Sequence, residues 1–214
     1  MCIRRAERSG SPVGRSRGVA FKVLGVNGSK REGSKGAVAL EIVLAACRLR
    51  GAETKLLDLR ALELPMFRPD RPADSGAARE VTAHAAWADA LVLSSPDYHG
   101  SMSGAMKNFL DYNWEEFAGK LFGHLCTSHE KGLTVMEHMR TVVRQCYGWS
   151  LPYGVSFHGE SDFDERGVLH NTEVVQRLEM LARDLVVYGP VIRSQFLRDL
   201  AGDDPDTFAA AYRR

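Results

Sequence analysis

Three short stretches of the sequence combine glycines with polar or charged side chains directly after an apolar run. The first stretch, residues 28–36 (GSKREGSKG), places the hydroxyls of Ser29 and Ser34 and the guanidinium of Arg31 among three glycines. Glycines let a ligand approach the backbone closely, and the amides at the start of a helix attract anions. Arginine can hold a phosphate with two hydrogen bonds. This stretch therefore predicts a phosphate-binding loop that opens a helix.

Two common phosphate-binding motifs do not fit the first stretch. A Walker A loop requires GxxxxGK[ST], but here Lys35 stands one position late and Gly36 replaces the Ser or Thr that would follow it. The dinucleotide-binding fingerprint needs GxG, which this stretch lacks. A solvated, lysine-rich turn is the alternative to a phosphate-binding loop.

The second stretch, SPDYHGSMSG, starts at Ser95 and offers flat side chains beside a glycine. Tyr98 and His99 provide planar surfaces, and Gly100 lets a planar ring lie against the backbone. Backbone amides of the stretch can donate to the carbonyls and nitrogens of such a ring. The alternative is a tight turn between a strand and a helix, with Ser101 or the next serine as the helix cap.

The third stretch, residues 127–132 (TSHEKG), carries a histidine. Three roles are open to His129: a general acid, a contact to the edge of a ligand, or an ordinary surface residue. The other six histidines show no metal-ligand spacing, so we predict no metal site. Lys107, Asn108 and Asp111 follow the second stretch, where a solvated helix face is the simplest interpretation.

Apolar periodicity indicates the elements that position these stretches. Strands are expected over 20–26, 53–59, 90–95, 121–127 and 152–158. Helices are expected over 37–50, 77–89 and 104–116, around Leu133, Met136, Met139, Val143 and Cys146, around Val174, Leu178, Leu181 and Leu185, and in a short segment within 190–214.

Five strands that alternate with five helices predict an α/β protein, a three-layer sandwich with helices on both faces of a parallel sheet. Five strands favour the flavodoxin-like order 2-1-3-4-5 over the six-stranded dinucleotide-binding fold. Ligands of such sheets bind beyond the carboxyl ends of the strands, close to where the strand order reverses. The three stretches all lie at that edge, so we expect one shared site.

The charge balance excludes some classes of protein. Lys and Arg total 28 against 27 Asp and Glu, a formal net charge of +1, whereas a dedicated nucleic-acid binder carries a basic stripe. We therefore expect no nucleic-acid partner. No run of 18 apolar residues exists, so we also expect no membrane span.

The amino-terminal segment differs from the rest of the chain. Residues 1–18 hold five arginines and one glutamate, a net +4, which leaves −3 for residues 19–214. We predict that 1–18 is a disordered basic extension, with a transit peptide as the alternative, and that 19–214 is a single domain. The cysteines are far apart and form no CxxC pair, which predicts reduced thiols and a cytoplasmic location: Cys2, Cys47, Cys126 and Cys146.

At its first two loops the chain resembles the NADPH-dependent FMN reductase family, a resemblance that extends over about residues 20–190. The first family motif is roughly G-S-x-R-x-x-S-x-N, and Gly36 stands in place of its Asn. The residues that match this motif are Gly28, Ser29, Arg31 and Ser34. The second motif is roughly P-E-Y-N-G-S, a small residue and L-K-N-x-L-D, with Asp97 and His99 in place of Glu and Asn. Its matches are Pro96, Tyr98, Gly100, Ser101, Lys107, Asn108, Leu110 and Asp111. The phrase from Phe117 to Lys120 is also similar to the family.

The resemblance implies FMN as the cofactor and assigns residues to its parts. The first loop is expected to hold the FMN phosphate through Ser29, Arg31, Ser34, Lys35 and Gly36. The second is expected to pack on the isoalloxazine ring through Pro96, Asp97, Tyr98, His99, Gly100 and Ser101. The third is expected to close the other side of the ring through Ser128, His129, Lys131 and Gly132. This third loop departs from the glycine-rich loop of the family, because bulky side chains occupy positions 129–131.

The resemblance also implies the activity. Hydride is expected to pass from NADPH or NADH to FMN and on to a small-molecule acceptor: a flavin, a quinone, an azo compound, a metal oxyanion or oxygen. The cofactor carries this chemistry, so we assign no catalytic residue. A homodimer or homotetramer is expected. The alternative is a flavodoxin-like electron carrier without NAD(P)H turnover, but such carriers are usually strongly acidic and residues 19–214 carry only −3.

Overall fold

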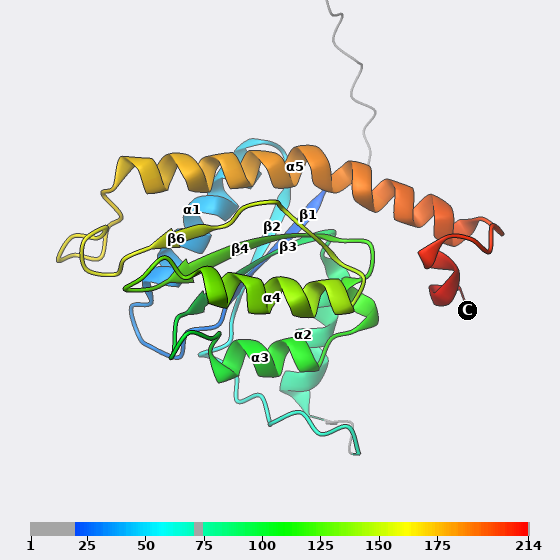
Figure 1. Cartoon of the computed structure of the whole chain (residues 1–214), viewed down its shortest axis with the longest axis horizontal. Helices are drawn as coiled ribbons and strands as arrows, with labels where there is room; N and C mark the ends of the chain where they lie inside the picture. Colours follow the sequence, from blue (N-terminus) through cyan, green and yellow to red (C-terminus); the bar gives the residue numbers. More distant parts are fainter. Residues whose placement is uncertain (1–19, 71–74, 214) are drawn as a thin grey trace, which may run out of the picture.

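A parallel sheet forms the middle layer of the structure, a computed structural model that describes residues 20–70 and 75–213 (Figure 1). Its strands are β1 (Lys22–Asn27), β2 (Glu53–Asp58), β3 (Ala90–Pro96), β4 (Leu121–Thr127), β5 (Trp149–Ser150) and β6 (Val155–Phe157). The order is β2-β1-β3-β4, and both β5 and β6 pair with the outer side of β4. The predicted flavodoxin-like order 2-1-3-4-5 is therefore confirmed. The basic extension predicted at 1–18 lies outside the described residues.

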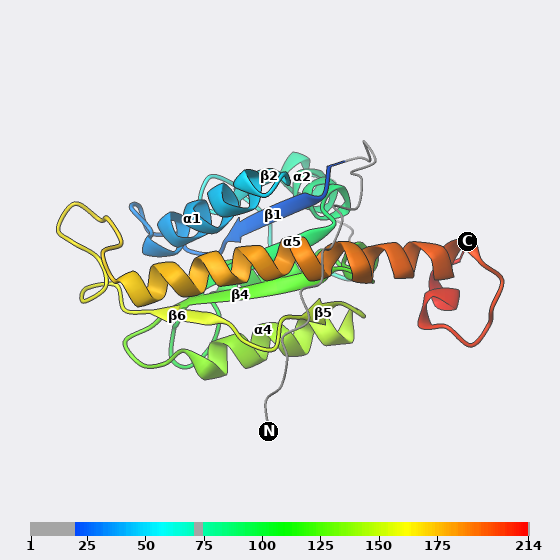
Figure 2. The ribbon, with the colours of Figure 1, turned by 90° about the horizontal axis from the view of Figure 1, so that it is seen from above.

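Helices cover both faces of the sheet, as predicted. One face packs against α1 (Lys35–Leu49) and α5 (Thr172–Ala201), and the other against α2 (Gly76–Trp87), α3 (Gly104–Asp111) and α4 (Leu133–Gln145) (Figures 1 and 2). Successive residues of β1 and β3 turn to opposite faces, and both faces are buried, which explains their continuous apolar runs. Among the described residues, none of the helices combines the length and apolar character that a membrane crossing needs.

The prediction of one fifth strand over 152–158 was wrong in detail. The ladder beside β4 runs through Leu151, whose amide donates to the Phe122 carbonyl at 2.9 Å. The regular pairing then stops and resumes where Val155 pairs with Leu125, so the outer strand holds two extra residues between its two paired parts. The strand is therefore two short pieces, β5 and β6, in place of one.

The helical segment expected separately within 190–214 was also wrong in detail. Helix α5 continues for thirty residues through Pro190, although that residue cannot supply its intrahelical hydrogen bond. Beyond Pro190 the helix is anchored by Phe196, which is buried and stacks on Phe208 with ring centroids 5.4 Å apart. Phe208 belongs to a 3₁₀ helix, η2 (Phe208–Tyr212), that folds back on the end of α5 (Figure 2). The helix predicted over 104–116 ends at Asp111, and a short 3₁₀ helix, η1 (Glu115–Phe117), follows it.

A buried histidine lies in the sheet where the fifth strand breaks. The His124 side chain is fully buried, and its Nε2 atom lies 2.9 Å from the Ser150 hydroxyl at the end of β5. Its Nδ1 atom has no hydrogen-bond partner among the described residues. Burial, helped by the nearby Arg140 charge, lowers the pKa of His124 from 6.5 to about 3. The native protein therefore holds this ring neutral at pH values where the unfolded chain protonates it.

We predict that His124 makes the protein lose stability in mild acid. Because the folded pKa lies below the unfolded value, its contribution is complete above pH 6.5 and declines as the pH falls toward 3. Urea unfolding at pH 7.5 and pH 4.5 should show a wild-type decline about 2–3 kcal/mol larger than that of His124→Gln. The glutamine can keep a hydrogen bond to Ser150 without titrating. Equal declines in the two proteins would contradict the assignment.

Candidate functional site

The three loops meet around a cavity of about 580 Å³ at the carboxyl ends of β1, β3 and β4. Ten of the predicted binding residues line it: Ser29, Arg31, Ser34, Lys35, Gly36, Pro96, Asp97, Tyr98, Ser128 and His129. Five others belong to the same loops but do not line it: His99, Gly100, Ser101, Lys131 and Gly132. The sequence therefore located the cavity, whereas the contribution of each side chain depends on the local geometry.

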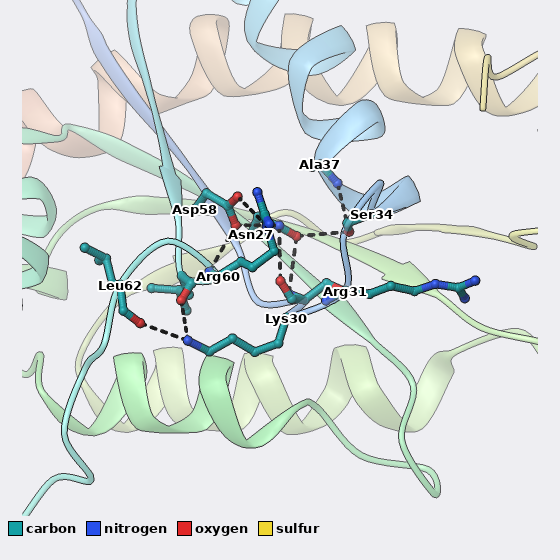
Figure 3. A network of polar contacts seen from close by, with 10 residues as sticks. Asn27, Lys30, Arg31, Ser34, Ala37, Asp58, Arg60 and Leu62 are labelled. Atoms are coloured by element: carbon teal, nitrogen blue, oxygen red, sulfur yellow. Dashed lines mark hydrogen bonds and ion pairs between the residues drawn. The ribbon is translucent and has the colours of Figure 1, made fainter. Parts of the chain in front are cut away.

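Asn27, the last residue of β1, organises the first loop. Its Nδ2 atom donates to Asp58 Oδ1 on the neighbouring strand at 2.9 Å, and its Oδ1 atom accepts from the Ser29 amide and the Ser34 hydroxyl, each at 3.3 Å (Figure 3). One buried amide thus joins both ends of the loop to the sheet. Asn27 also lines the cavity, and the sequence analysis missed it. A polar residue that ends an apolar run was the available signal.

The start of α1 forms a cradle beside this network. The Ser34 hydroxyl accepts from the Ala37 amide and caps the helix, while the amides of Lys35 and Gly36 have no acceptor among the described residues. A Cβ atom on Gly36 would lie 2.6 Å from Ser94 Oγ, so only glycine fits without a shift. Ser94 Oγ is itself buried and has no hydrogen-bond partner among the described residues. Free amides, a helix start and an orphaned hydroxyl together fit a bound phosphate.

Lys30 and Arg31, two of the three cations of the first loop, have different surroundings. Lys30 Nζ donates to the carbonyls of Leu59 at 2.7 Å and Leu62 at 2.9 Å, so it ties the loop to the segment after β2. The Arg31 side chain extends away from this network (Figure 3), and its guanidinium has no hydrogen bond or ion pair within residues 20–70 and 75–213. Arg31 is therefore the residue of the pair that is free to bind an anion.

Asp97 joins the second loop to the third. One of its carboxylate oxygens accepts from the Gly100 amide and the other from the Ser128 hydroxyl, both at 2.8 Å. Its own amide donates to the Thr127 carbonyl at 2.9 Å. Asp97 and Ser128, both predicted to contact the cofactor, thus also hold the two loops together.

His99 and Gly100 form the tip of a tight turn. Both have positive φ, 58° and 80°, and the turn is closed by two backbone hydrogen bonds between Tyr98 and Ser101. Glycine adopts such a conformation without strain. Tyr98 is about half exposed (51%) and lines the cavity, so its ring is the flat surface that the second loop offers.

The third loop ends at a glycine that the packing requires. Gly132 has a φ of 60°, and a Cβ atom there would lie 2.6 Å from Cys126 Sγ. Burial, followed by the charge of Asp97, raises the pKa of the Cys126 thiol to about 12, so this sulfur is not a nucleophile at neutral pH. Cys47, Cys126 and Cys146 are all buried and free.

A fourth segment completes the cavity, and the sequence analysis missed it. This segment lies between β6 and α5 and contributes Gly159, Glu160, Phe163, Asp164 and Glu165. Phe163 is buried, and the ammonium of Lys35 lies 5.1 Å from its ring centroid. No motif marks the segment, so only the fold brings it to the first loop. No cluster of three His, Cys, Asp or Glu residues in the described part of the chain is arranged to hold a metal ion.

Comparison with known proteins identifies relatives. A family model for NADPH-dependent FMN reductase matches residues 21–162. The FMN-dependent NADPH-azoreductase of Staphylococcus aureus is 34% identical over 109 residues, which are 47% of this chain and 56% of the relative. The chain thus spans about half the length of the curated relatives it matches.

Solved structures share the fold at low sequence identity. The apo form of the NADH:FMN oxidoreductase EMOB has a TM-score of 0.67 at 20% identity, over 79% of this chain and 90% of that one. FerB, an NAD(P)H:acceptor oxidoreductase from Paracoccus denitrificans, has a TM-score of 0.65 at 17% identity, over 80% and 97%. An archaeal flavodoxin gives 0.56 at 12% identity, over 79% and 99%. These likenesses support the flavodoxin-like fold.

We predict that Gly36 and Ser94 are coupled through their close approach. Gly36→Ala should lower the free energy of unfolding by about 1–3 kcal/mol, because the new methyl group collides with Ser94 Oγ. Ser94→Ala removes that oxygen, so the double variant should recover most of the loss. A double-mutant cycle of urea unfolding measures the coupling. Strictly additive losses would show that the collision is not the cause.

Proposed function

The chain belongs to the NADPH-dependent FMN reductase family, and from this premise we propose that it binds FMN in the cavity and reduces a small-molecule acceptor with NADPH or NADH. When bound, FMN supplies the hydride chemistry. The observation that carries the proposal is the cradle at the start of α1, where free amides, Gly36 and the orphaned Ser94 hydroxyl fit a phosphate.

In this proposal the first loop binds the FMN phosphate. Ser29 offers a hydroxyl, Arg31 offers an unpaired guanidinium, and the amides of Lys35 and Gly36 offer the positive end of the α1 dipole. Ser34, whose hydroxyl donates to Asn27, lines the same part of the cavity and holds the loop in shape. Arg31 is exposed, which leaves it free to close on an anion.

The second and third loops hold the isoalloxazine ring in this proposal. Pro96 and Tyr98 line the cavity and provide the flat contact, with the turn residues His99, Gly100 and Ser101 supporting Tyr98. The other side belongs to the third loop, where Ser128 and His129 line the cavity and Lys131 and Gly132 complete the loop. The bond between Asp97 and Ser128 sets the separation of the two loops.

The acceptor, the nicotinamide, the assembly and the location belong to the same proposal. The S. aureus relative is named an azoreductase, so an azo compound is an acceptor to test beside quinones, flavins, metal oxyanions and oxygen.

We propose a homodimer or homotetramer. We also propose a cytoplasmic location, which agrees with the three free buried thiols among the described residues.

The proposed activity predicts a bound flavin that NADPH or NADH reduces. The purified full chain is mixed with FMN, desalted and scanned for the flavin absorbance band, and NADPH or NADH is then added anaerobically. We expect the band to be retained and then bleached. A band that persists with both nicotinamides would favour an electron carrier instead, and the absence of bound flavin would overturn the proposal.

Arg31 should contribute directly to FMN affinity. Arg31→Ala should weaken FMN binding by about 1–3 kcal/mol through loss of a charge-assisted contact to phosphate, and Arg31→Lys should recover part of it. Arg144→Ala, on the last turn of α4, is the matched control for loss of an exposed arginine. Riboflavin, which lacks the phosphate, should bind wild type and Arg31→Ala alike. A similar loss for riboflavin would place the contact away from the phosphate.

A further inference from the structure

Two histidines from different loops lie in direct contact beside the cavity. His129 follows β4 and lines the cavity, and His158 follows β6. His129 Nδ1 lies 3.0 Å from His158 Nε2, and the rings meet edge to face with centroids 4.8 Å apart. His158 belongs to neither family motif. Since one nitrogen of this pair must donate and the other accept, the surrounding hydrogen bonds decide which tautomer each ring adopts.

The backbone determines the tautomer of His158. Its Nδ1 atom lies 3.2 Å from the amide nitrogen of Glu160 and 3.2 Å from that of Ser161. Backbone amides only donate, so Nδ1 of His158 must be the acceptor and carry no hydrogen. The proton of the neutral ring is therefore on Nε2, the atom that faces His129.

His158 in turn determines the tautomer of His129. Because His158 Nε2 donates, His129 Nδ1 accepts, and the neutral His129 ring carries its hydrogen on Nε2. That Nε2–H group has no hydrogen-bond partner in the part of the chain that the structure describes. The neutral His129 ring is thus a donor of fixed tautomer at the wall of the ligand cavity.

We propose that His129 is a specificity-determining hydrogen-bond donor for the ligand in this cavity, and that His158 is the residue that positions it. The group it selects is an uncharged acceptor atom on a planar ligand, a carbonyl oxygen or an unprotonated nitrogen. The proposal rests on the proposed function, because both the flavin ring and a quinone or azo acceptor carry such atoms. It gives a role to His129, the first of the bulky residues at 129–131 that set the third loop apart from the glycine-rich loop of the family.

The tautomer is tested on the protein without ligand. Imidazole ¹⁵N shifts distinguish a nitrogen that bears hydrogen from one that does not, so wild type should show His129 with hydrogen on Nε2 alone. His158→Gln keeps a donor close to the place of Nε2 and should preserve this state. His158→Asn can still accept from the backbone but is too short to reach His129, so it should give a mixture of tautomers. The same mixture in wild type would overturn the role of His158.

The ligand is tested with two probes, FMN and 1,4-benzoquinone. His129→Phe keeps a ring without the donor, whereas His129→Gln keeps an N–H group at a similar distance from the backbone. If the His129 Nε2–H group donates to the flavin, His129→Phe should weaken FMN binding about 3- to 10-fold. If it serves the acceptor, FMN affinity should hold and KM for benzoquinone should rise by a similar factor. His129→Gln should keep FMN affinity and KM close to their wild-type values. His158→Asn should change whichever of these two quantities His129→Phe changes.

The outcomes separate this proposal from the proposed function. His170→Phe is the control, since His170 is exposed, its side chain has no hydrogen bond among the described residues, and it does not line the cavity. Unchanged FMN affinity and unchanged KM in His129→Phe would overturn the donor role while the reductase activity stood. If wild type failed to bind FMN at all, the proposed function would fall and the donor role with it, although the ¹⁵N measurement would still report the tautomer.

Discussion

The buried side-chain amide of Asn27 is the contact on which the proposed phosphate site depends. A loop that must present free amides and hydroxyls to a ligand cannot satisfy its own polar groups, so something else has to hold its shape. Asn27 does this from the rigid end of β1, by binding Asp58 on one side and both Ser29 and Ser34 on the other. Because the amide is buried, its oxygen and its nitrogen each need a partner within the protein. The first amides of α1 can therefore stay unpaired at the edge of the cavity.

Other residues around the cavity also form hydrogen bonds within the protein and so position a neighbour that can contact the ligand. The two carboxylate oxygens of Asp97 accept hydrogen bonds from the Gly100 amide and the Ser128 hydroxyl, and these bonds join the second and third loops. His158 uses both ring nitrogens on the backbone and on His129. In each case a residue that is fully engaged within the protein leaves a neighbour free to meet the ligand: Tyr98 in the second loop and His129 in the third.

The segment between β6 and α5 adds an aromatic ring and carboxylates to the cavity wall. The family match ends at residue 162, and Phe163, Asp164 and Glu165 line the cavity directly after it. Phe163 is fixed by burial, by an edge-to-face contact with Phe157 and by the ammonium of Lys35. Carboxylates thus enter the wall beside a basic loop.

The sequence by itself determined the alternation of strands and helices and the location of the cavity. Both follow from local patterns: buried strands read as apolar runs, and loops after parallel strands must meet at one edge. The break between β5 and β6 escaped it, because the shift of two residues in the pairing with β4 exists only in the folded sheet. The continuation of α5 through Pro190 escaped it, because Phe196 beyond the proline is held by its contact with Phe208. Only the tertiary structure decided that Asp97 and Ser128 bind each other, that Asn27 reaches Asp58, and that His158 lies against His129. Those contacts join residues about 30 positions apart, and no local pattern of residue types encodes a distance of that kind.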